Sequence, residues 1–335
     1  MRFALTDDQL ALRDAVREVL AGTCPPAAVR AAWPSDPAGA STVDRVWTAL
    51  AGLGVPGMAV PEKLGGLGLT DVDLVPVLTE VGAAVVPLPV AETAAVAAPL
   101  LAAAGDPGER LPGILSGTTV VALRTGDGPV AYAGRADLVL DLTGGLARIG
   151  PPAGVPVSTV DGSRAALAVS QSPADLVTAD ASLVALARDR ADLATAAQLV
   201  GLSRRMLDMT VGYVRERHQF GVPVGSFQAV KHHLADALIG IEFAEPVVLA
   251  AAAALVSGSP ERGRDVSAAV VHAVEAARAT ARTAIQCHGA IGYTVEYDLH
   301  LYAKRAWALA ATCELDAHLG RIARALDLPE GVLSP

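Results

Sequence analysis

The sequence has few of the groups that mark several common protein classes. Its three cysteines, Cys24, Cys287 and Cys313, stand far apart and lack metal-ligand spacing, so we expect buried free thiols and no metal site. Aromatic residues make up only 4% of the chain, the net charge is −9, and no run of lysine and arginine forms a basic stripe. A nucleic-acid partner is therefore not expected. An anionic small molecule would have to be bound by a few local arginines.

Long uninterrupted apolar segments are also lacking. The longest apolar run, residues 246–256, is rich in alanine and shorter than the roughly 20 residues that a membrane-spanning helix needs. The N-terminal segment carries Asp7, Asp8 and Asp14 among its apolar residues, unlike a signal or transit peptide. We therefore expect a cytoplasmic protein without a membrane partner.

What the sequence does have is a high hydrophobic content, 52% over 335 residues, which is enough for a large buried core. Helical periodicity dominates both ends, and short strand-like runs split by Gly, Pro and Asp lie between them. The sequence predicts a mainly α fold with a small β-domain, divided into an N-terminal helical domain (1–110), a small β-domain (111–178) and a C-terminal four-helix bundle (179–335). The expected helices are residues 6–20, 43–53, 70–82, 91–104, 183–216, 226–257, 265–288 and 299–326, and the expected strands are 118–123, 136–142 and 165–169.

One segment, YVRERHQFGVPVGSFQAVKHHLAD (residues 213–236), joins two of these long helices. Gly221 and Pro223 interrupt the helical pattern, so a tight corner is expected there. Arg217 and Gln219 stand just before the break and Gln228 just after it, where planar donor groups near a helix N-terminus favour phosphate. The alternative is structural: Arg217 pairs with a surface carboxylate, and the neighbouring aromatic, Phe220, belongs to the core.

Together with FALTDDQLALRDAVREVL, VPEKLGGLGLT and QCHGAIGYTVEYDLHLY, this segment resembles the acyl-CoA dehydrogenase family, flavoproteins that introduce a double bond α,β to a CoA thioester. In that family FAD lies between subunits. The neighbouring subunit supplies an Arg-x-Gln-Phe-Gly corner and a Gln-x-x-Gly-Gly loop to the pyrophosphate and adenine end of the cofactor. The second glycine of that loop is Ala290 here. Carried over, the resemblance implies as FAD-binding residues Arg217, Gln219, Phe220, Gln228, Gln286 and Gly289.

The residues that a family member supplies to its own flavin ring are not found. The family has an aromatic-Thr-Glu-Pro-Gly run and a Trp-x-Thr-Asn-Gly-like loop, whereas this chain reads VVALRTGDGPVAYAGRADLVLDLTGG and has no tryptophan between Trp47 and Trp307. Thr125 and Thr143 are substitutes that lack the expected neighbours. The resemblance therefore implies that this half of the flavin site is missing.

The glutamate that removes the α-proton in relatives is also missing. The family places it ten positions after the tyrosine equivalent to Tyr302, which is Thr312 here, or twenty-six positions before the corner arginine, which is Ala191. Asp192 adjoins the second position. Glu314 lies two residues beyond the first, and in a continuous helix that spacing turns a side chain by about 200°. No catalytic residue is assigned, and Glu314 is the candidate that remains.

This asymmetry resembles the short chains of actinobacterial acyl-CoA dehydrogenases built from two unlike subunits, which act on bulky thioesters such as those of steroid side chains. The first hypothesis is a non-catalytic subunit of an α2β2 enzyme that shares FAD with a full-length partner and passes electrons to an electron-transferring flavoprotein. The second is a self-sufficient homo-oligomeric enzyme whose base is Glu314. The third is a flavin-free scaffold subunit.

Overall fold

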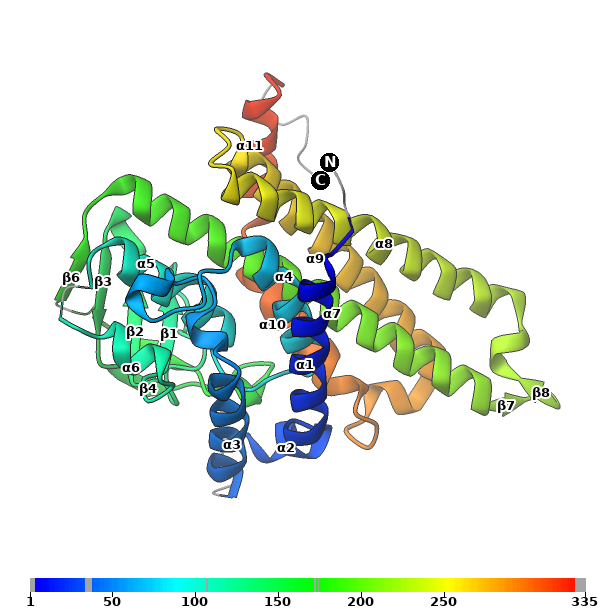
Figure 1. The fold of residues 1–335 in the computed structure, drawn as a ribbon. Coiled ribbons are helices and arrows are strands. Elements are labelled where there is room, and N and C mark those ends of the chain that lie inside the picture. Colours follow the sequence, from blue (N-terminus) through cyan, green and yellow to red (C-terminus); the bar gives the residue numbers. More distant parts are fainter. Residues whose placement is uncertain (1–3, 34–37, 107, 172, 174, 329–335) are drawn as a thin grey trace. The chain divides into compact units, whose positions relative to one another are not determined.

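The computed structural model describes residues 4–33, 38–106, 108–171, 173 and 175–328 (Figure 1). The predicted fold class, mainly helical with a small sheet region, is confirmed. The chain divides into two compact units. One consists of Leu5–Leu78 and Val86–Ala194, and the other contains Thr79–Val85 and the described residues from Thr195 onward. The domain boundaries expected near residues 110 and 178 stay a prediction.

The first of these units contains most of the short helices. Its first helix begins with a capping box, in which the Gln9 N–H donates to Thr6 Oγ1 (3.3 Å) and the Thr6 N–H donates to Gln9 Oε1 (3.0 Å). The predicted connection after it holds a further helix, which begins at Pro26 because proline is tolerated in a first helical turn. The helices are α1 (Asp7–Thr23), α2 (Pro26–Ala31), α3 (Ala38–Gly52), η1 (Val55–Gly57), η2 (Glu62–Leu64), the start of α4 (Asp71–Ala83), η3 (Glu92–Ala97), α5 (Ala98–Ala103), α6 (Leu111–Leu115), η4 (Thr143–Gly145), η5 (Gly162–Arg164) and the start of α7 (Ala181–Glu216).

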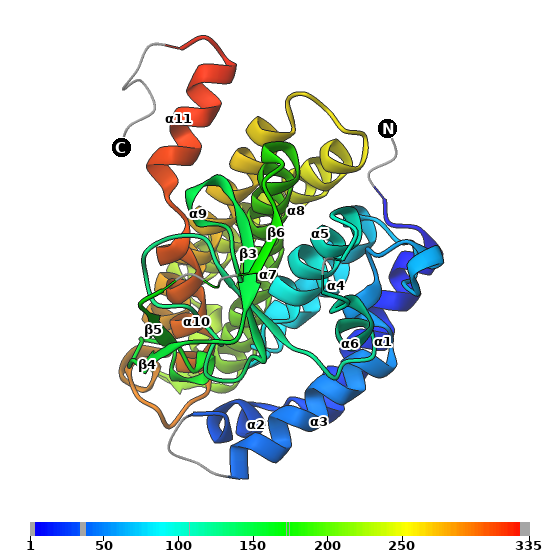
Figure 2. The same cartoon turned by 90° about the vertical axis from the view of Figure 1, so that its left-hand side faces the viewer.

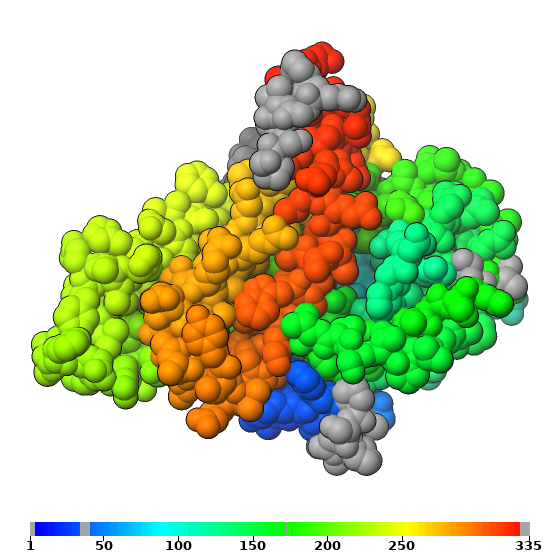
Figure 3. Space-filling model, turned by 180° about the vertical axis from the view of Figure 1, so that it is seen from behind, coloured from blue at the N-terminus to red at the C-terminus, as the bar shows by residue number. Residues whose placement is uncertain are grey.

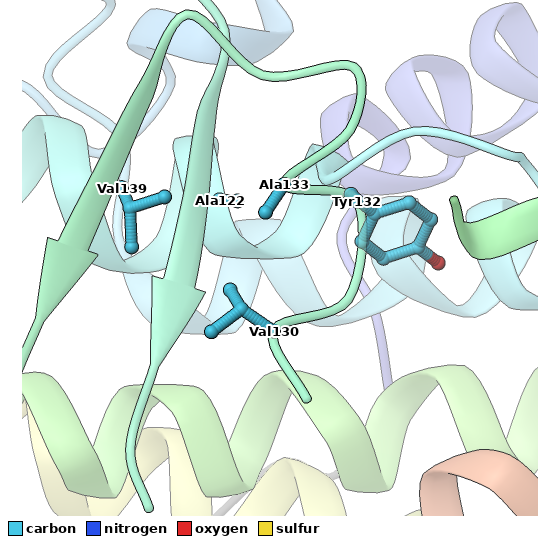
Figure 4. Close-up of a cluster of buried hydrophobic side chains, with 5 residues drawn as sticks. All are labelled: Ala122, Val130, Tyr132, Ala133 and Val139. Atoms are coloured by element: carbon cyan, nitrogen blue, oxygen red, sulfur yellow. The ribbon is translucent and has the colours of Figure 1, made fainter. Parts of the chain in front are cut away.

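The same unit holds a four-stranded sheet of order β1-β2-β3-β6, in which β1 and β2 are parallel and the other pairs antiparallel, and a separate β4–β5 pair. The predicted runs 136–142 and 165–169 contain β2 and β5, and the run 118–123 overlaps β1. The other three strands were not expected, because each has at most two apolar residues and begins or ends with Gly, Pro or Asp. Five buried side chains form a core cluster beside β1 and β2 (Figure 4). The strands are β1 (Val121–Arg124), β2 (Leu138–Asp141), β3 (Ala147–Gly150), β4 (Gly154–Pro156), β5 (Leu167–Val169) and β6 (Asp175–Thr178).

The second unit is built on long helices, and α8 and α9 run side by side (Figure 1). Its elements are the end of α4, α7 from Thr195 onward, β7 (His218–Gln219), β8 (Val222–Pro223), η6 (Val224–Ser226), α8 (Gln228–Val256), α9 (Arg262–His288), η7 (Gly289–Tyr293), α10 (Leu299–Thr312) and α11 (Leu315–Ala325). By length and composition α8 could cross a membrane, a test that core helices of soluble proteins also pass.

The expected single helix over residues 299–326 is wrong, because α10 ends at Thr312 and α11 begins at Leu315 (Figure 2). Cys313 has an extended conformation (φ −82°, ψ 111°). The Thr312 hydroxyl and the Cys313 thiol both donate to the Leu309 carbonyl, at 2.8 and 3.4 Å. These side chains compete for an acceptor that a continuing helix would use, and the helix stops there.

Two glycines allow α4 and α7 to cross closely within the second unit. A Cβ added at Gly82 would lie 2.2 Å from the Gln198 carbonyl oxygen, and one at Gly201 would lie 1.9 Å from the Thr79 carbonyl oxygen. Both obstacles are backbone atoms, which cannot move aside as a flexible side chain could. The crossing therefore requires glycine at both positions.

His318 of α11 is buried against α9. The Ser267 hydroxyl donates to the Gly263 carbonyl (2.7 Å), so the 3.1 Å contact between His318 Nδ1 and Ser267 Oγ has the imidazole as donor. Burial, followed by the nearby charge of Arg321, lowers the pKa of His318 from 6.5 to about 4. The ring is therefore neutral in the folded protein at pH 7.

This buried histidine predicts that the protein becomes less stable in mild acid. As the pH falls below 6.5 the unfolded chain binds the proton first, so the free energy of unfolding should fall by on the order of 2–3 kcal/mol between pH 6.5 and 4. His318→Gln keeps a donor but does not titrate, and should flatten this part of the profile in urea unfolding at several pH values. His272→Gln, at an exposed position of α9, serves as the control. A slope equally steep in His318→Gln would contradict the assignment.

Candidate functional site

The predicted corner between the two long helices is a short β-hairpin. β7 pairs with β8, with His218 opposite Pro223 and Gln219 opposite Val222. The two turn residues, Phe220 (φ 53°) and Gly221 (φ 79°), both have left-handed backbone conformations, as a two-residue hairpin loop requires. Glycine adopts this conformation at little cost, but a bulky aromatic residue is strained in it, and such strain is often found at functional positions.

Arg217 lies at the base of this hairpin with its backbone fixed on both sides. Its N–H donates to the Tyr213 carbonyl (2.9 Å), and its carbonyl accepts from the Val224 N–H (2.7 Å). The side chain is exposed and makes no hydrogen bond or ion pair with the residues that the structure describes. Phe220 is 92% exposed. The structural alternative, a surface ion pair for Arg217 and a core position for Phe220, is therefore not what the structure has.

The start of α8 completes this side of the site. Gln228 is its first residue and is exposed, and the preceding Phe227 offers no side-chain cap, so the first-turn amides have no side-chain acceptor there. Uncapped amides at the positive end of a 29-residue helix suit an anion. The Phe227 ring meets the Phe220 ring edge to face, with centroids 6.2 Å apart. The sequence did not indicate this aromatic partner, because Phe227 lies outside the Arg-x-Gln-Phe-Gly corner (residues 217–221).

The end of α9 carries the other predicted residues. Gln286 and Gly289 are both exposed, and the Gln286 side chain has no hydrogen bond within the described part of the chain. Gly289 ends the helix with φ 66° and ψ −138°, a conformation essentially restricted to glycine. Ala290, which replaces the family's second glycine, is exposed, so this chain tolerates the extra methyl group.

An aromatic cluster joins the hairpin to the end of α9. The Tyr213 ring, one turn before Arg217, stacks on the His288 ring at 4.3 Å, and Tyr297 packs against both rings. In Figure 3 yellow-green atoms of the α7–α8 region lie beside orange atoms of the α9 region. The structure thus brings the two predicted groups to one end of the helical unit. The sequence shows that Tyr213 and Arg217 share a helix face, but the contact with His288 depends on the packing of α7 on α9.

The exposed groups at this end fit part of an FAD molecule. The Arg217 guanidinium, the amides of Gln219 and Gln286, and the uncapped start of α8 are all free to donate to a diphosphate. Thr143, one of the substitutes for the flavin-ring half, is less suited. The Thr143 hydroxyl already donates to Asp141 Oδ1 (2.7 Å), as does the Thr143 N–H (2.8 Å).

The two positions where relatives carry the catalytic glutamate, 191 and 312, hold no carboxylate here. The nearest carboxylates, Asp192 and Glu314, lie in different surroundings. Glu314 lies in the break between α10 and α11, where the rotation expected for a continuous helix does not apply. Its side chain is exposed and does not cap α11. Asp192 lies within α7, and Arg190, two residues before it, forms an ion pair with Asp71, with Nε to Oδ1 at 3.0 Å.

Neither a reactive cysteine nor a metal site is found among the described residues. Burial raises the pKa of the Cys287 thiol, which disfavours the reactive thiolate. In the described ranges no group of three or more histidine, cysteine, aspartate or glutamate residues could hold a metal ion.

Comparisons with known proteins agree with the fold and the motifs. The chain is 34% identical over 312 residues to the acyl-CoA dehydrogenase IpdE2 of Mycobacterium tuberculosis, covering 92% of this chain and 93% of the relative. A solved variant of the Tcur3481-Tcur3483 steroid ACAD is 26% identical with a TM-score of 0.83, over 98% of this chain and 99% of that one. The ChsE4-ChsE5 complex from Mycobacterium tuberculosis shares the fold, with 24% identity and a TM-score of 0.79 over 99% of this chain and 100% of that chain.

The family models match most of the chain as well. The acyl-CoA dehydrogenase N-terminal domain matches residues 6–117, and the acyl-CoA dehydrogenase C-terminal domain matches residues 181–312. The hairpin with Arg217 and the loop after α9 both fall within the second match. The chain belongs to the acyl-CoA dehydrogenase family.

Proposed function

We propose that this chain is the non-catalytic subunit of an FAD-dependent acyl-CoA dehydrogenase, and that it contacts FAD held mainly by a full-length partner subunit. The observation that carries the proposal is the set of exposed donors at one end of the helical unit. Arg217, Gln219 and Gln286 have no side-chain partners within the described chain, although a guanidinium and two amides are suited to a diphosphate.

An exposed apolar surface supports the presence of a partner subunit. Phe220 at the hairpin tip is 92% exposed, and farther along α8 Leu238, Ile239 and Phe243 are also exposed, Phe243 to 66%. Large apolar side chains gathered on one helix commonly mark a protein–protein interface. This chain is similar to the Tcur3481-Tcur3483 steroid ACAD, an enzyme named after two proteins. That name agrees with an enzyme of two unlike subunits.

In this assembly FAD would accept the hydride that leaves the β-carbon of the thioester. The residues of this chain bind and orient the cofactor. Arg217 neutralises the diphosphate, Gln219 and Gln286 fix its direction, and Phe220 shields it from water. The partner supplies the carboxylate that takes the α-proton, because positions 191 and 312 of this chain hold alanine and threonine.

We infer that the substrate class is a CoA thioester with a bulky ring system of the steroid type. The support is the similarity to the steroid ACAD structure. We further infer an α2β2 assembly whose electron acceptor is an electron-transferring flavoprotein.

The proposal is tested by purifying the chain alone and together with a full-length acyl-CoA dehydrogenase subunit from the same organism. The chain alone should contain no FAD and should not oxidise an acyl-CoA with an artificial electron acceptor, whereas the co-purified complex should be yellow and active. A chain that binds FAD stoichiometrically and oxidises a thioester by itself would contradict the proposal.

The break after α10 supports one alternative, in which Glu314 is the base of a self-sufficient enzyme. Under this alternative Glu314→Gln should lower kcat of the chain alone by at least about 100-fold, because the glutamine cannot take the α-proton. Asp316→Asn, two residues farther and equally exposed, is the matched control. Under our proposal neither substitution changes the activity of the complex more than about twofold.

A further inference from the structure

Three aromatic rings from three segments meet between the hairpin and the end of α9. Tyr213 comes from α7, His288 is the last residue of α9, and Tyr297 follows η7. The rings of Tyr213 and His288 stack at 4.3 Å with 23° between their planes, and Tyr297 lies 4.8 Å from His288. The Tyr213 hydroxyl also donates to the His288 carbonyl (3.4 Å). We call these three residues the aromatic stack.

His288 is the central ring of the aromatic stack and is almost completely buried, with 4% exposed. The acceptor at its Nδ1 is the Ala284 carbonyl (2.7 Å), so the ring hydrogen is on Nδ1 and Nε2 carries a lone pair. Nε2 is buried and has no hydrogen-bond partner among the described residues. Since a buried polar atom without a partner is destabilising, hydrogen bonding at Nε2 is not what suits histidine to this position. What suits the residue to this position is its flat ring, which stacks on the Tyr213 ring and packs at a tilt of 45° against the Tyr297 ring.

Both groups of candidate FAD donors begin directly at this stack. The Arg217 N–H donates to the Tyr213 carbonyl (2.9 Å), so the guanidinium lies one helical turn beyond a stacked ring. On the other side, Gln286 precedes His288 by two residues and Gly289 follows it. A change in the stack would therefore shift the end of α9 relative to the hairpin.

We propose that the aromatic stack positions the two donor groups for a single FAD molecule, with His288 as the positioning residue. This inference rests on the proposed function, since it needs FAD to be bound by Arg217 and Gln286. His288 does not touch the cofactor and acts through these two residues. Donors on two separate segments bind one diphosphate more tightly when their spacing is fixed before FAD arrives, because less ordering is then needed on binding.

The test compares His288→Ala, which removes the stacked ring, with His288→Phe, which keeps a flat ring and lacks the unpaired nitrogen. Each variant chain is purified in complex with the partner subunit, and the FAD dissociation constant is measured by flavin fluorescence after removal and titration of FAD. We expect about 10-fold weaker FAD binding for His288→Ala. His288→Phe should bind FAD within about threefold of the unaltered complex, and its flavin absorption spectrum should be unchanged.

A second pair protects the test against misfolding. Tyr213→Phe keeps the ring and loses only the hydroxyl, so it should bind FAD nearly as His288→Phe does. Tyr213→Leu loses the ring and should weaken FAD binding as His288→Ala does. Melting temperatures separate stability from positioning, since a purely structural stack would lower the melting temperature without changing the dissociation constant of the folded complex. That result would overturn the inference, as would equal losses of affinity in His288→Ala and His288→Phe.

Arg217→Ala in the same titration separates this inference from the proposed function. If Arg217→Ala weakens FAD binding and His288→Ala does not, only the positioning role is wrong. If neither substitution changes FAD binding, the proposed function fails as well.

Discussion

Replacing Arg217 by alanine is expected to weaken FAD binding by the assembled complex about 10- to 100-fold. The guanidinium is exposed, has no side-chain partner in the described chain and lies at the base of a hairpin with a fixed backbone. A hydrogen bond to a charged group contributes about 1.5–3 kcal/mol, and loss of a paired guanidinium–phosphate contact falls in that range. Arg217→Lys should recover only part of the affinity, because lysine offers a point charge and no planar fork.

The FAD dissociation constant of the purified complex checks this expectation, and native mass spectrometry confirms that the subunits remain associated. Arg278→Ala is the matched control, since Arg278 is an exposed arginine of α9 outside the candidate set. Unchanged FAD binding in Arg217→Ala would favour the flavin-free scaffold subunit. An equal loss in Arg278→Ala would indicate a general effect of charge.

Replacing Gly201 by alanine should have the largest effect on stability. The new methyl group would lie 1.9 Å from the Thr79 carbonyl oxygen, so α4 and α7 would have to separate where they cross. Overpacking of this kind costs about 1–3 kcal/mol and occasionally more, and a backbone obstacle places this position at the upper end. The midpoint of urea unfolding, followed by circular dichroism, should fall accordingly.

The same helix provides the control. A Cβ at Gly212 of α7 would meet nothing within 4 Å, so Gly212→Ala should raise stability by about 0.5–1 kcal/mol through helix propensity alone. The opposite signs of two identical substitutions in α7 make the test sharp. Equal stability of the two variants would show that the close crossing of α4 and α7 does not exist.

The long helices could be predicted from the sequence because periodicity and punctuation agree in them. The capping box of Thr6 and Gln9 starts α1, and Gly289 ends α9 where the apolar pattern stops. Short strands were predicted only where three apolar residues stand together. β3, β4 and β6 have at most two apolar residues each and begin or end with Gly, Pro or Asp, which are typical of turns. The break after Thr312 depends on two side chains that compete for the Leu309 carbonyl, and a helical pattern does not reveal such competition.

In the candidate site too, features of local sequence could be predicted and contacts between distant residues could not. The motifs supplied Arg217, Gln219 and Gln286, because spacing between polar residues and glycines is visible in the sequence. The aromatic stack was not predicted, since Tyr213 and His288 are 75 residues apart and only the packing of α7 on α9 brings them together. The commitment of Thr143 to Asp141 was equally invisible, because it depends on a side-chain rotamer in a loop.

The central claim is that this chain completes the FAD site of another subunit. Native mass spectrometry of the chain alone and of the co-expressed complex, reading FAD per oligomer, tests it most directly. The account predicts no FAD in the chain alone and one FAD per unlike pair in a mixed tetramer. Two FAD molecules per pair, or FAD bound to the chain alone, would contradict it, because this chain would then build a complete flavin site of its own.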